Sequence, residues 1–173
     1  LRTTGYYHRQ QDLGAFFLEA SGYERPQWFE SNADLVAKYP SPKRDDWTSM
    51  FWSPIVGAEA QHTREHVGLF DIAPLKRIEV SGKGAVEFLM EQTTGKLDKA
   101  VGSVTYCLLL PATAGLLSAV PVPRLGETHF LIGANSAVDA ARLQMAAPDT
   151  VFVRDVTAGT VALGLFGPNA RKV

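Results

Sequence analysis

Cysteine is almost absent from this chain. Cys107 is the only one in 173 residues, which excludes an internal disulfide and a zinc site built from cysteines. Its place inside an apolar run predicts a buried, unreactive thiol. Few cysteines and no disulfide are typical of a reducing compartment, so we expect a cytoplasmic location.

An excess of charge is also missing. The chain has 17 Lys and Arg against 18 Asp and Glu, and its formal net charge is −1. The short basic run Lys43-Arg44 is followed at once by Asp45-Asp46. Because nucleic-acid-binding surfaces are strongly basic, we expect no nucleic-acid partner.

Long apolar runs are lacking as well. None reaches the roughly 20 residues of a transmembrane helix, and no signal peptide is visible at the start. We therefore expect no membrane association. The chain begins with Leu1 and stops at Val173, where the sequence predicts the start of a helix; we expect it to be a piece of a longer protein.

The common catalytic motifs do not occur. Ser81–Ala85 has Gly and Lys between a strand and a helix, but it lacks the length and ending of a phosphate-binding loop, so a tight turn is the better interpretation. No G-x-S-x-G nucleophile elbow is present. Glu59 and His62 have the spacing of a di-metal motif, but the second such helix that this site needs is missing, and we expect no metal.

The longest apolar stretch of the chain runs from Val101 to Ala134. Gly and Pro divide it into runs of strand length at Val104–Leu110, Leu116–Val122 and Thr128–Ile132. We predict a three-stranded meander with turns at Ala112–Gly115 and Pro123–Glu127. Pro121 falls inside the second run, which predicts an edge strand or a bulge there.

The remaining elements surround this meander. The sequence predicts helices at 55–67, 85–90 and 135–145, the last with Asn135 as its N-cap, and strands at 68–72, 76–81, 150–155 and 160–166. Strands in pairs between single helices predict an α+β fold with a mostly antiparallel sheet and helices on one face.

Residues 1–46 differ from the rest. Helical spacing from Tyr7 to Ala20 predicts a helix that stops at Gly22. Polar residues and two prolines predict a loop from Ser31 to Asp46. We interpret residues 1–46 as a strap or linker whose Trp28 and Phe29 dock on another unit, and residues 47–173 as the start of a further domain.

Several segments together resemble a known family. They are RTTGYYHRQQDLGAFFLEASGYERPQWFE, WTSMFWS, Glu59 with residues 62–64, VGLFDIAPLKRIEVSGKGAVEFLMEQTTGKLDK, VGSVTYCLLL, RLGETHFLIGA and DVTAGTVALGLFGPNAR. The chain resembles the folate-binding domain of dimethylglycine oxidases, dimethylglycine dehydrogenases and sarcosine dehydrogenases, and most closely that of the bacterial dimethylglycine oxidases. More widely it is similar to the T-protein of the glycine cleavage system, an aminomethyltransferase.

The resemblance implies a tetrahydrofolate-binding domain of three subdomains, of which this chain holds the first. It implies an upstream FAD domain that oxidises an N-methyl amine, and downstream subdomains that complete the folate site. Tetrahydrofolate then captures the one-carbon unit as 5,10-methylene-tetrahydrofolate. The 173 residues alone are expected to be inactive.

The resemblance also places the cofactor-binding residues. Tyr106 corresponds to the tyrosine of the family's folate site, and the adjoining Leu108 and Leu110 form its wall. The aspartate that is the family's proposed base corresponds to Ala119, in a hairpin where Ala114 and Pro121 also differ from the family pattern. Ala119 cannot take a proton, and strand alternation points the neighbouring Ser118 to the opposite face. We therefore expect no catalytic residue in this chain.

Two alternatives stay open. Related domains occur in a regulatory subunit of pyruvate dehydrogenase phosphatase, so the chain could be a non-catalytic regulatory or scaffold domain. It could also belong to a methyltransferase of this fold that uses another methyl donor, such as a sulfonium or a methoxy-aromatic compound.

Overall fold

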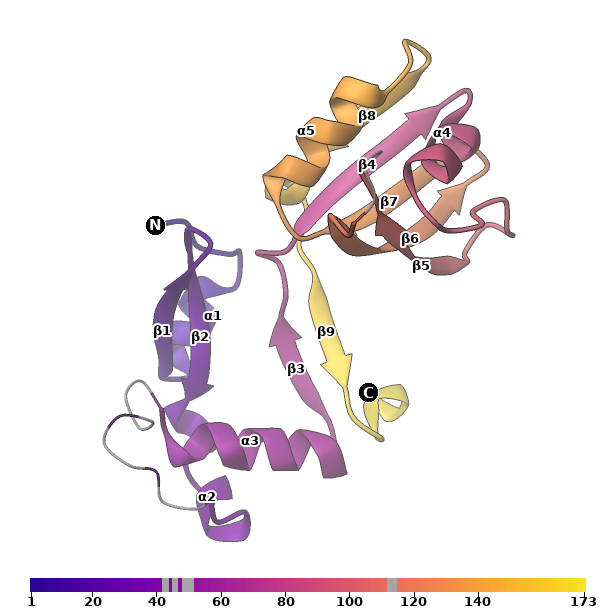
Figure 1. Cartoon of the computed structure of the whole chain (residues 1–173). Coiled ribbons are helices and arrows are strands. Elements are labelled where there is room, and N and C mark those ends of the chain that lie inside the picture. Colours follow the sequence, from indigo (N-terminus) through magenta and orange to yellow (C-terminus); the bar gives the residue numbers. More distant parts are fainter. Residues whose placement is uncertain (42–43, 45–46, 48–51, 112–114) are drawn as a thin grey trace. The chain divides into compact units, whose positions relative to one another are not determined.

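A computed structural model describes residues 1–41, 44, 47, 52–111 and 115–173. The chain forms two compact units (Figure 1). Unit 1 combines Leu1–Pro74 with Val161–Val173, and unit 2 is Leu75–Thr160. The domain boundary predicted at residue 46 concerns the longer protein and stays a prediction.

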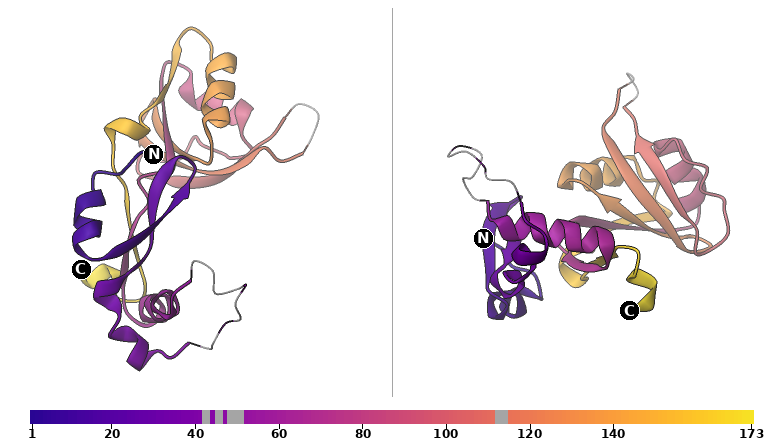
Figure 2. Two further views of the ribbon diagram at one scale, coloured as in Figure 1. Left: turned by 90° about the vertical axis from the view of Figure 1, so that its left-hand side faces the viewer. Right: turned by 90° about the horizontal axis from the view of Figure 1, so that it is seen from below.

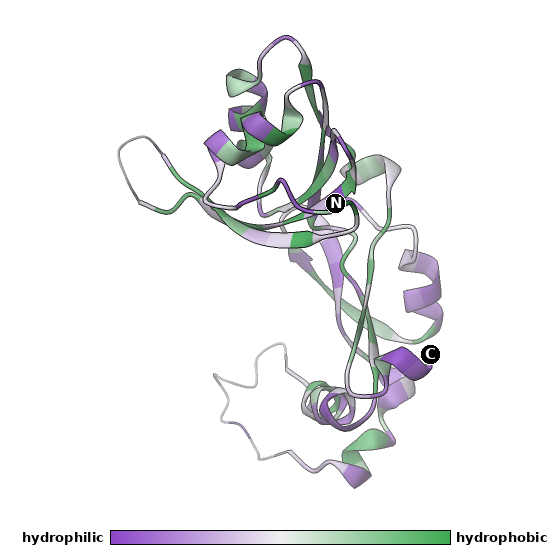
Figure 3. Ribbon diagram, turned by 90° about the vertical axis from the view of Figure 1, so that its right-hand side faces the viewer, coloured by the Kyte–Doolittle hydropathy of each residue, from purple (hydrophilic) through white to green (hydrophobic). Residues whose placement is uncertain are grey.

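Unit 1 is a small mixed assembly of hairpin, helices and a two-stranded sheet. Its elements are α1 (Tyr7–Asp12), β1 (Ala15–Ala20), β2 (Tyr23–Phe29), η1 (Glu30–Asn32), α2 (Leu35–Lys38), α3 (Pro54–Glu65), β3 (Gly68–Asp71), β9 (Leu163–Phe166) and η3 (Ala170–Lys172). Strands β3 and β9 pair antiparallel, and both consist largely of hydrophobic residues, whereas α1 and η3 are mostly hydrophilic (Figure 3).

The helix predicted for Tyr7–Ala20 is wrong beyond Asp12. Residues from Ala15 onward form a twisted antiparallel hairpin with β2 (Figure 2). Ser21 and Gly22 at its turn both have positive φ, 55° and 80°, as in the two-residue turns that join antiparallel strands. The loop predicted for 31–46 contains η1 and α2, and its residues 42, 43, 45 and 46 lie outside the described part.

The aromatic residues of the hairpin pack within unit 1. Trp28 is 8% exposed and stacks on Phe16 at 4.2 Å between ring centroids. Its indole N–H donates to Glu30. Trp28 is therefore packed and hydrogen-bonded within unit 1, and docking of Trp28 and Phe29 on a further unit of the longer protein stays a prediction.

Unit 2 is a five-stranded antiparallel sheet with two helices. Its elements are β4 (Lys76–Gly82), α4 (Ala85–Gln92), β5 (Val104–Leu109), β6 (Ser118–Gly126), β7 (His129–Ala134), α5 (Ala137–Ala146), β8 (Val151–Asp155) and η2 (Thr157–Gly159). The strand order is β5-β6-β7-β4-β8. The predicted meander and the α+β class are confirmed, although β6 continues through the predicted Pro123–Glu127 turn. Ala112–Ala114 of the other turn lie outside the described residues.

One face of this sheet forms the core. Its side chains alternate along each strand, and the buried set meets both helices. The core is Ile78, Val80, Cys107, Leu109, Val120, Val122, Phe130, Ile132, Ala134 and Val151 from the sheet, Ala85, Phe88, Leu89, Ala140 and Leu143 from α4 and α5, and Leu97 from the segment between α4 and β5. The opposite face carries the other half of each strand's side chains, and it is called the open face below.

Pro121 lies in an interior strand and not on an edge strand, whereas a bulge, the other prediction for this strand, occurs between Arg124 and Gly126. The Arg124 amide donates to the carbonyl of Ser103, on the side of β6 that faces β5. Because successive backbone nitrogens of a strand point to opposite neighbours, those of Pro121 and Pro123 point toward β7. The recorded β6–β7 pairs start only at Arg124, where a bulge interrupts the register. The prolines are tolerated because they occupy a stretch where β6 does not donate to β7.

Most predicted boundaries shift by one or two residues, and two of the changes matter for the fold. Helix α5 starts one residue later than expected, because Ser136 is the N-cap and forms a capping box with Asp139. The predicted strand 160–166 is shorter, and as β9 it pairs with β3 of unit 1 rather than with the sheet of unit 2. Among the described residues, no helix is long and apolar enough to cross a membrane.

Candidate functional site

Three of the four predicted site residues share the open face of unit 2. Tyr106 and Leu108 are two residues apart on β5, and Ala119 lies directly opposite Leu108 on β6. Pro121 is opposite Tyr106. Tyr106 is 70% exposed, so its ring offers a flat apolar surface. The strand pairing thus places Tyr106 and Ala119 diagonally, a separation of about 7–8 Å between Cα positions.

Gly133 extends this surface onto β7, and sequence reasoning missed it. A Cβ atom on Gly133 would lie 3.0 Å from Cγ of Pro121, and Gly133 pairs with Arg77 on the other side. The missing side chain leaves room for the ring of Pro121. A glycine inside a strand is the signal that could have found it, since such a residue often marks close approach of another group.

Arg77 borders the open face but is not available for a ligand. It is 7% exposed, and its guanidinium donates to the backbone oxygens of Leu75, Thr157 and Thr160 and to the Thr160 hydroxyl. These carbonyl oxygens accept hydrogen bonds from the guanidinium and compensate the burial of its charge. Arg77 therefore holds η2 and the start of β4 together.

Ser118 points to the core face, as alternation predicted. It is 6% exposed, and its hydroxyl donates to Asp139 Oδ2 at 3.1 Å. The same hydroxyl accepts from Asn135 Nδ2 at 2.8 Å, and Nδ2 also donates to the Ala119 carbonyl at 3.1 Å. A polar network therefore lies directly behind Ala119, although position 119 itself has no polar side chain.

Leu110 lies outside the set formed by Tyr106, Leu108 and Ala119. It follows the end of β5, is 46% exposed, and lines a groove of about 370 Å³. The other walls of that groove come from the hairpin, α4 and α5: Gln92, Leu109, Pro111, Leu117, Asp139, Arg142, Leu143, Met145 and Ala146. The role of Leu110 in a folate wall stays a prediction.

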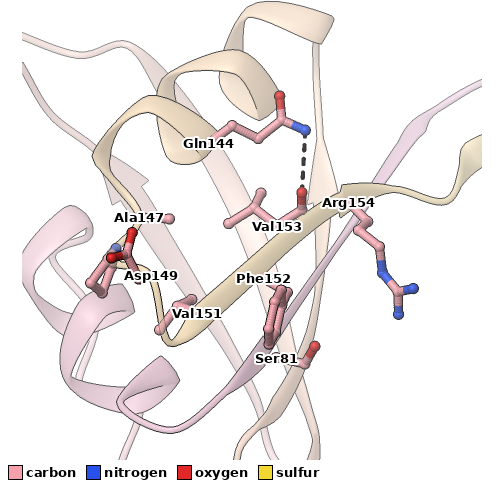
Figure 4. A pocket seen from close by; sticks show the side chains of 9 residues that line it. Ser81, Gln144, Ala147, Asp149, Val151, Phe152, Val153 and Arg154 are labelled. Atoms are coloured by element: carbon pink, nitrogen blue, oxygen red, sulfur yellow. Dashed lines mark hydrogen bonds between the residues drawn. The ribbon is translucent and has the colours of Figure 1, made fainter.

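A second groove, of about 460 Å³, follows the free edge of β8 (Figure 4). Gln144 of α5 reaches over this edge and donates to the Val153 carbonyl at 3.2 Å. Arg154 points away from it and pairs with Glu79 at 2.8 Å. Covering an edge strand with a side chain prevents pairing with other strands, and we interpret this groove as a protected sheet edge.

The metal and thiol candidates have structural roles. Glu59 accepts from the Phe29 amide and from Asn32, and burial raises the pKa of its carboxyl despite these bonds. No group of three possible metal ligands occurs among the described residues. Cys107 is 1% exposed, and burial raises the pKa of its thiol, which makes it a poor nucleophile.

Comparison with known proteins gives the family. The model for the GCVT N-terminal domain matches residues 6–173. The chain is 32% identical to the 4-methylaminobutanoate oxidase (formaldehyde-forming) of Paenarthrobacter nicotinovorans, over all of this chain and 21% of that protein. It is 29% identical to the mitochondrial pyruvate dehydrogenase phosphatase regulatory subunit of Mus musculus, over 98% of this chain and 20% of that protein.

A solved structure agrees with these relatives. The glycine cleavage system aminomethyltransferase T of Bartonella henselae matches with a TM-score of 0.78 at 29% identity, over 99% of this chain and 42% of that one. The chain thus spans about a fifth of the two longer relatives and less than half of the aminomethyltransferase. It belongs to the GCVT N-terminal domain family and has the aminomethyltransferase fold.

Proposed function

We propose that this chain is the leading part of a tetrahydrofolate-binding domain in an FAD-dependent oxidoreductase of N-methyl amines, related to the bacterial dimethylglycine oxidases. The observation that carries the proposal is the open face of unit 2, where Tyr106, Leu108 and Pro121 form one apolar surface and Gly133 makes room for the Pro121 ring. A relative named as a formaldehyde-forming oxidase of a methylamino acid supports the reaction class. A cytoplasmic location stays a prediction.

The residues present suit a planar ring held by contact rather than by charge. The exposed ring of Tyr106 can stack on a pterin, and aromatic stacking contributes about 0.5–1.5 kcal/mol beyond the buried area. Leu108 and Pro121 continue the apolar surface on either side. Binding would therefore persist without a carboxylate at position 119.

This face lacks a side chain at position 119 that can accept a proton. Tetrahydrofolate supplies two amine nitrogens, which together take up one carbon at the oxidation level of formaldehyde and release water. A base held at the reacting nitrogen typically contributes 10²–10⁴ in rate, and Ala119 provides none. The proton would pass to water, so we expect slow methylene transfer with much of the formaldehyde released free.

The test uses the full-length parent with its amine substrate and tetrahydrofolate. Formaldehyde and 5,10-methylene-tetrahydrofolate are measured in parallel, and folate binding is measured by isothermal titration calorimetry. We expect saturable binding and a small folate-dependent share of product. Absence of saturable binding in the intact parent would refute the proposal.

A regulatory or scaffold domain is the second candidate. Two observations favour it. Ala119 stands where the family has its proposed base, and 98% of this chain is similar to part of a phosphatase regulatory subunit. This candidate predicts that the parent binds no tetrahydrofolate. The same titration therefore separates the two.

A further inference from the structure

Asn135 stands beside the position where the family carboxylate is missing. It follows the last residue of β7, and the register that pairs Arg124 with Phe130 brings Asn135 opposite Ala119 when extended by five residues. The hydrogen bond from its Nδ2 to the Ala119 carbonyl, 3.1 Å long, confirms this neighbourhood. Asn135 is exposed, and Ser136 rather than Asn135 caps α5. Helix capping therefore does not account for its side chain.

The surroundings fix which way the amide points. The atom that faces the Ala119 carbonyl must be the NH₂ group, because a carbonyl oxygen only accepts hydrogen bonds. The same NH₂ group donates to Ser118 Oγ at 2.8 Å, so both of its hydrogens are used. The Oδ1 atom is then turned away from Ser118, and among the described residues it receives no hydrogen bond.

A buried carboxylate anchors this arrangement. The Ser118 hydroxyl accepts from Asn135 and in turn donates to Asp139 Oδ2. Asp139 Oδ2 also accepts from the backbone amides of Asn135 and Ser136 at 3.1 and 3.2 Å. Successive donors polarise one another in such a chain. Asp139 is 5% exposed and already accepts three hydrogen bonds, so it serves as the anchor and not as the ligand contact.

We propose that Asn135 is a ligand-binding residue: its Oδ1, held in place by Ser118 and the Ala119 carbonyl, accepts a hydrogen bond from an N–H group of the reduced pterin in place of the missing carboxylate. This inference rests on the proposed function. An amide accepts a hydrogen bond but does not take up a proton at neutral pH. Asn135 therefore supports binding and orientation without restoring the base.

The experiment measures tetrahydrofolate affinity and steady-state kinetics in the full-length parent. Removing a neutral hydrogen bond typically weakens binding about two- to tenfold, so Asn135→Ala should raise the Kd and the KM for tetrahydrofolate by roughly fivefold. Oxidation of the amine, followed as hydrogen peroxide or by an artificial electron acceptor, should not change. Asn135→Asp replaces the NH₂ group with an oxygen that cannot donate to Ser118 or to the Ala119 carbonyl, so it loses the fixed orientation and should also bind more weakly than the parent.

Gln144→Ala is the matched control, since it removes another exposed amide that donates to a backbone carbonyl of unit 2. It should leave the Kd within twofold. If the parent binds tetrahydrofolate and Asn135→Ala binds it equally well, this inference is wrong and the proposed function stands. An equal loss in Asn135→Ala and Gln144→Ala would also refute the inference, because it would show a general effect on folding. If the parent does not bind at all, the proposed function fails and this inference fails with it.

Discussion

Restoring a carboxylate at position 119 is the sharpest perturbation that this fold offers. In Ala119→Asp the new side chain lies opposite Leu108 on the open face, on the same side of the sheet as Tyr106. A hydrogen bond to a charged group contributes about 1.5–3 kcal/mol. Asp is disfavoured in strands and is partly buried at this position, which costs about 1 kcal/mol.

The net gain is therefore about 0.5–2 kcal/mol, or roughly two- to thirtyfold tighter tetrahydrofolate binding, since each 1.4 kcal/mol is a factor of ten. Methylene transfer should rise more than affinity, because a positioned base contributes 10²–10⁴ in rate. Isothermal titration calorimetry and product analysis of the full-length variant measure the two effects. A thermal melt shows whether the variant is folded.

The control is Ala119→Asn, which has nearly the same shape and no charge. It should improve binding slightly and leave the transfer rate unchanged. If Ala119→Asp and Ala119→Asn both match the parent in affinity and in product, position 119 does not face the folate. The assignment of the open face would then be refuted.

Three further outcomes follow from the same structure. Gly133→Ala brings a methyl group to 3.0 Å from Pro121 Cγ and displaces the Pro121 ring on the open face, so tetrahydrofolate affinity should fall roughly tenfold, about 1.4 kcal/mol, by titration of the parent. Arg77→Met deprives buried backbone carbonyls of their donor and should lower the free energy of unfolding by about 3 kcal/mol in urea denaturation. Although partial burial acts in the opposite direction, the hydrogen bond from Lys76 lowers the pKa of Asp155 to about 2. This pair should therefore stabilise the fold above about pH 4 and lose that effect as the pH falls toward 2. In Lys76→Met, the free energy of unfolding should depend less on pH between about pH 4 and pH 2.

The face of each strand in the meander could be predicted because the side-chain period of a strand is two. Once Val104–Leu109 is a strand, Tyr106 and Leu108 must share one face and Cys107 the other. The same alternation places Ser118 and Ala119 on opposite faces from the sequence alone. Pairing Leu108 with Ala119 needed the structure, since register depends on where the turn lies.

The hairpin at Ala15–Phe29 shows why local spacing was not enough in unit 1. Leu13, Phe16 and Phe17 fit a helix as well as they fit a strand. The deciding contact is the stacking of Phe16 on Trp28, which lies twelve residues away and on the partner strand. A single-sequence pattern does not contain such a pairing.

Asn135 was misread for a similar reason. As a polar residue before an apolar-periodic run it was a good N-cap candidate, but Ser136 stands one residue later with Asp139 three residues beyond it. That is the spacing of a capping box in which Asp replaces the usual Glu. Because Ser136 caps α5, the Asn135 side chain is available to bond to Ser118 and to the Ala119 carbonyl. Only the folded structure shows that Ser118 and Asp139 lie next to Asn135.

Binding and chemistry can be separated on this face because they depend on different atoms. An apolar surface is made by many groups, here the ring of Tyr106, the side chains of Leu108 and Pro121, and the backbone at Gly133. Proton transfer depends on one carboxylate, and one substitution removes it. A loss of that kind lowers kcat by more than it lowers the affinity for the ligand. A slow parent enzyme that binds tetrahydrofolate roughly two- to thirtyfold more weakly than its Ala119→Asp variant is therefore the pattern that this arrangement of residues predicts, and weak binding with a normal rate is the pattern that it excludes.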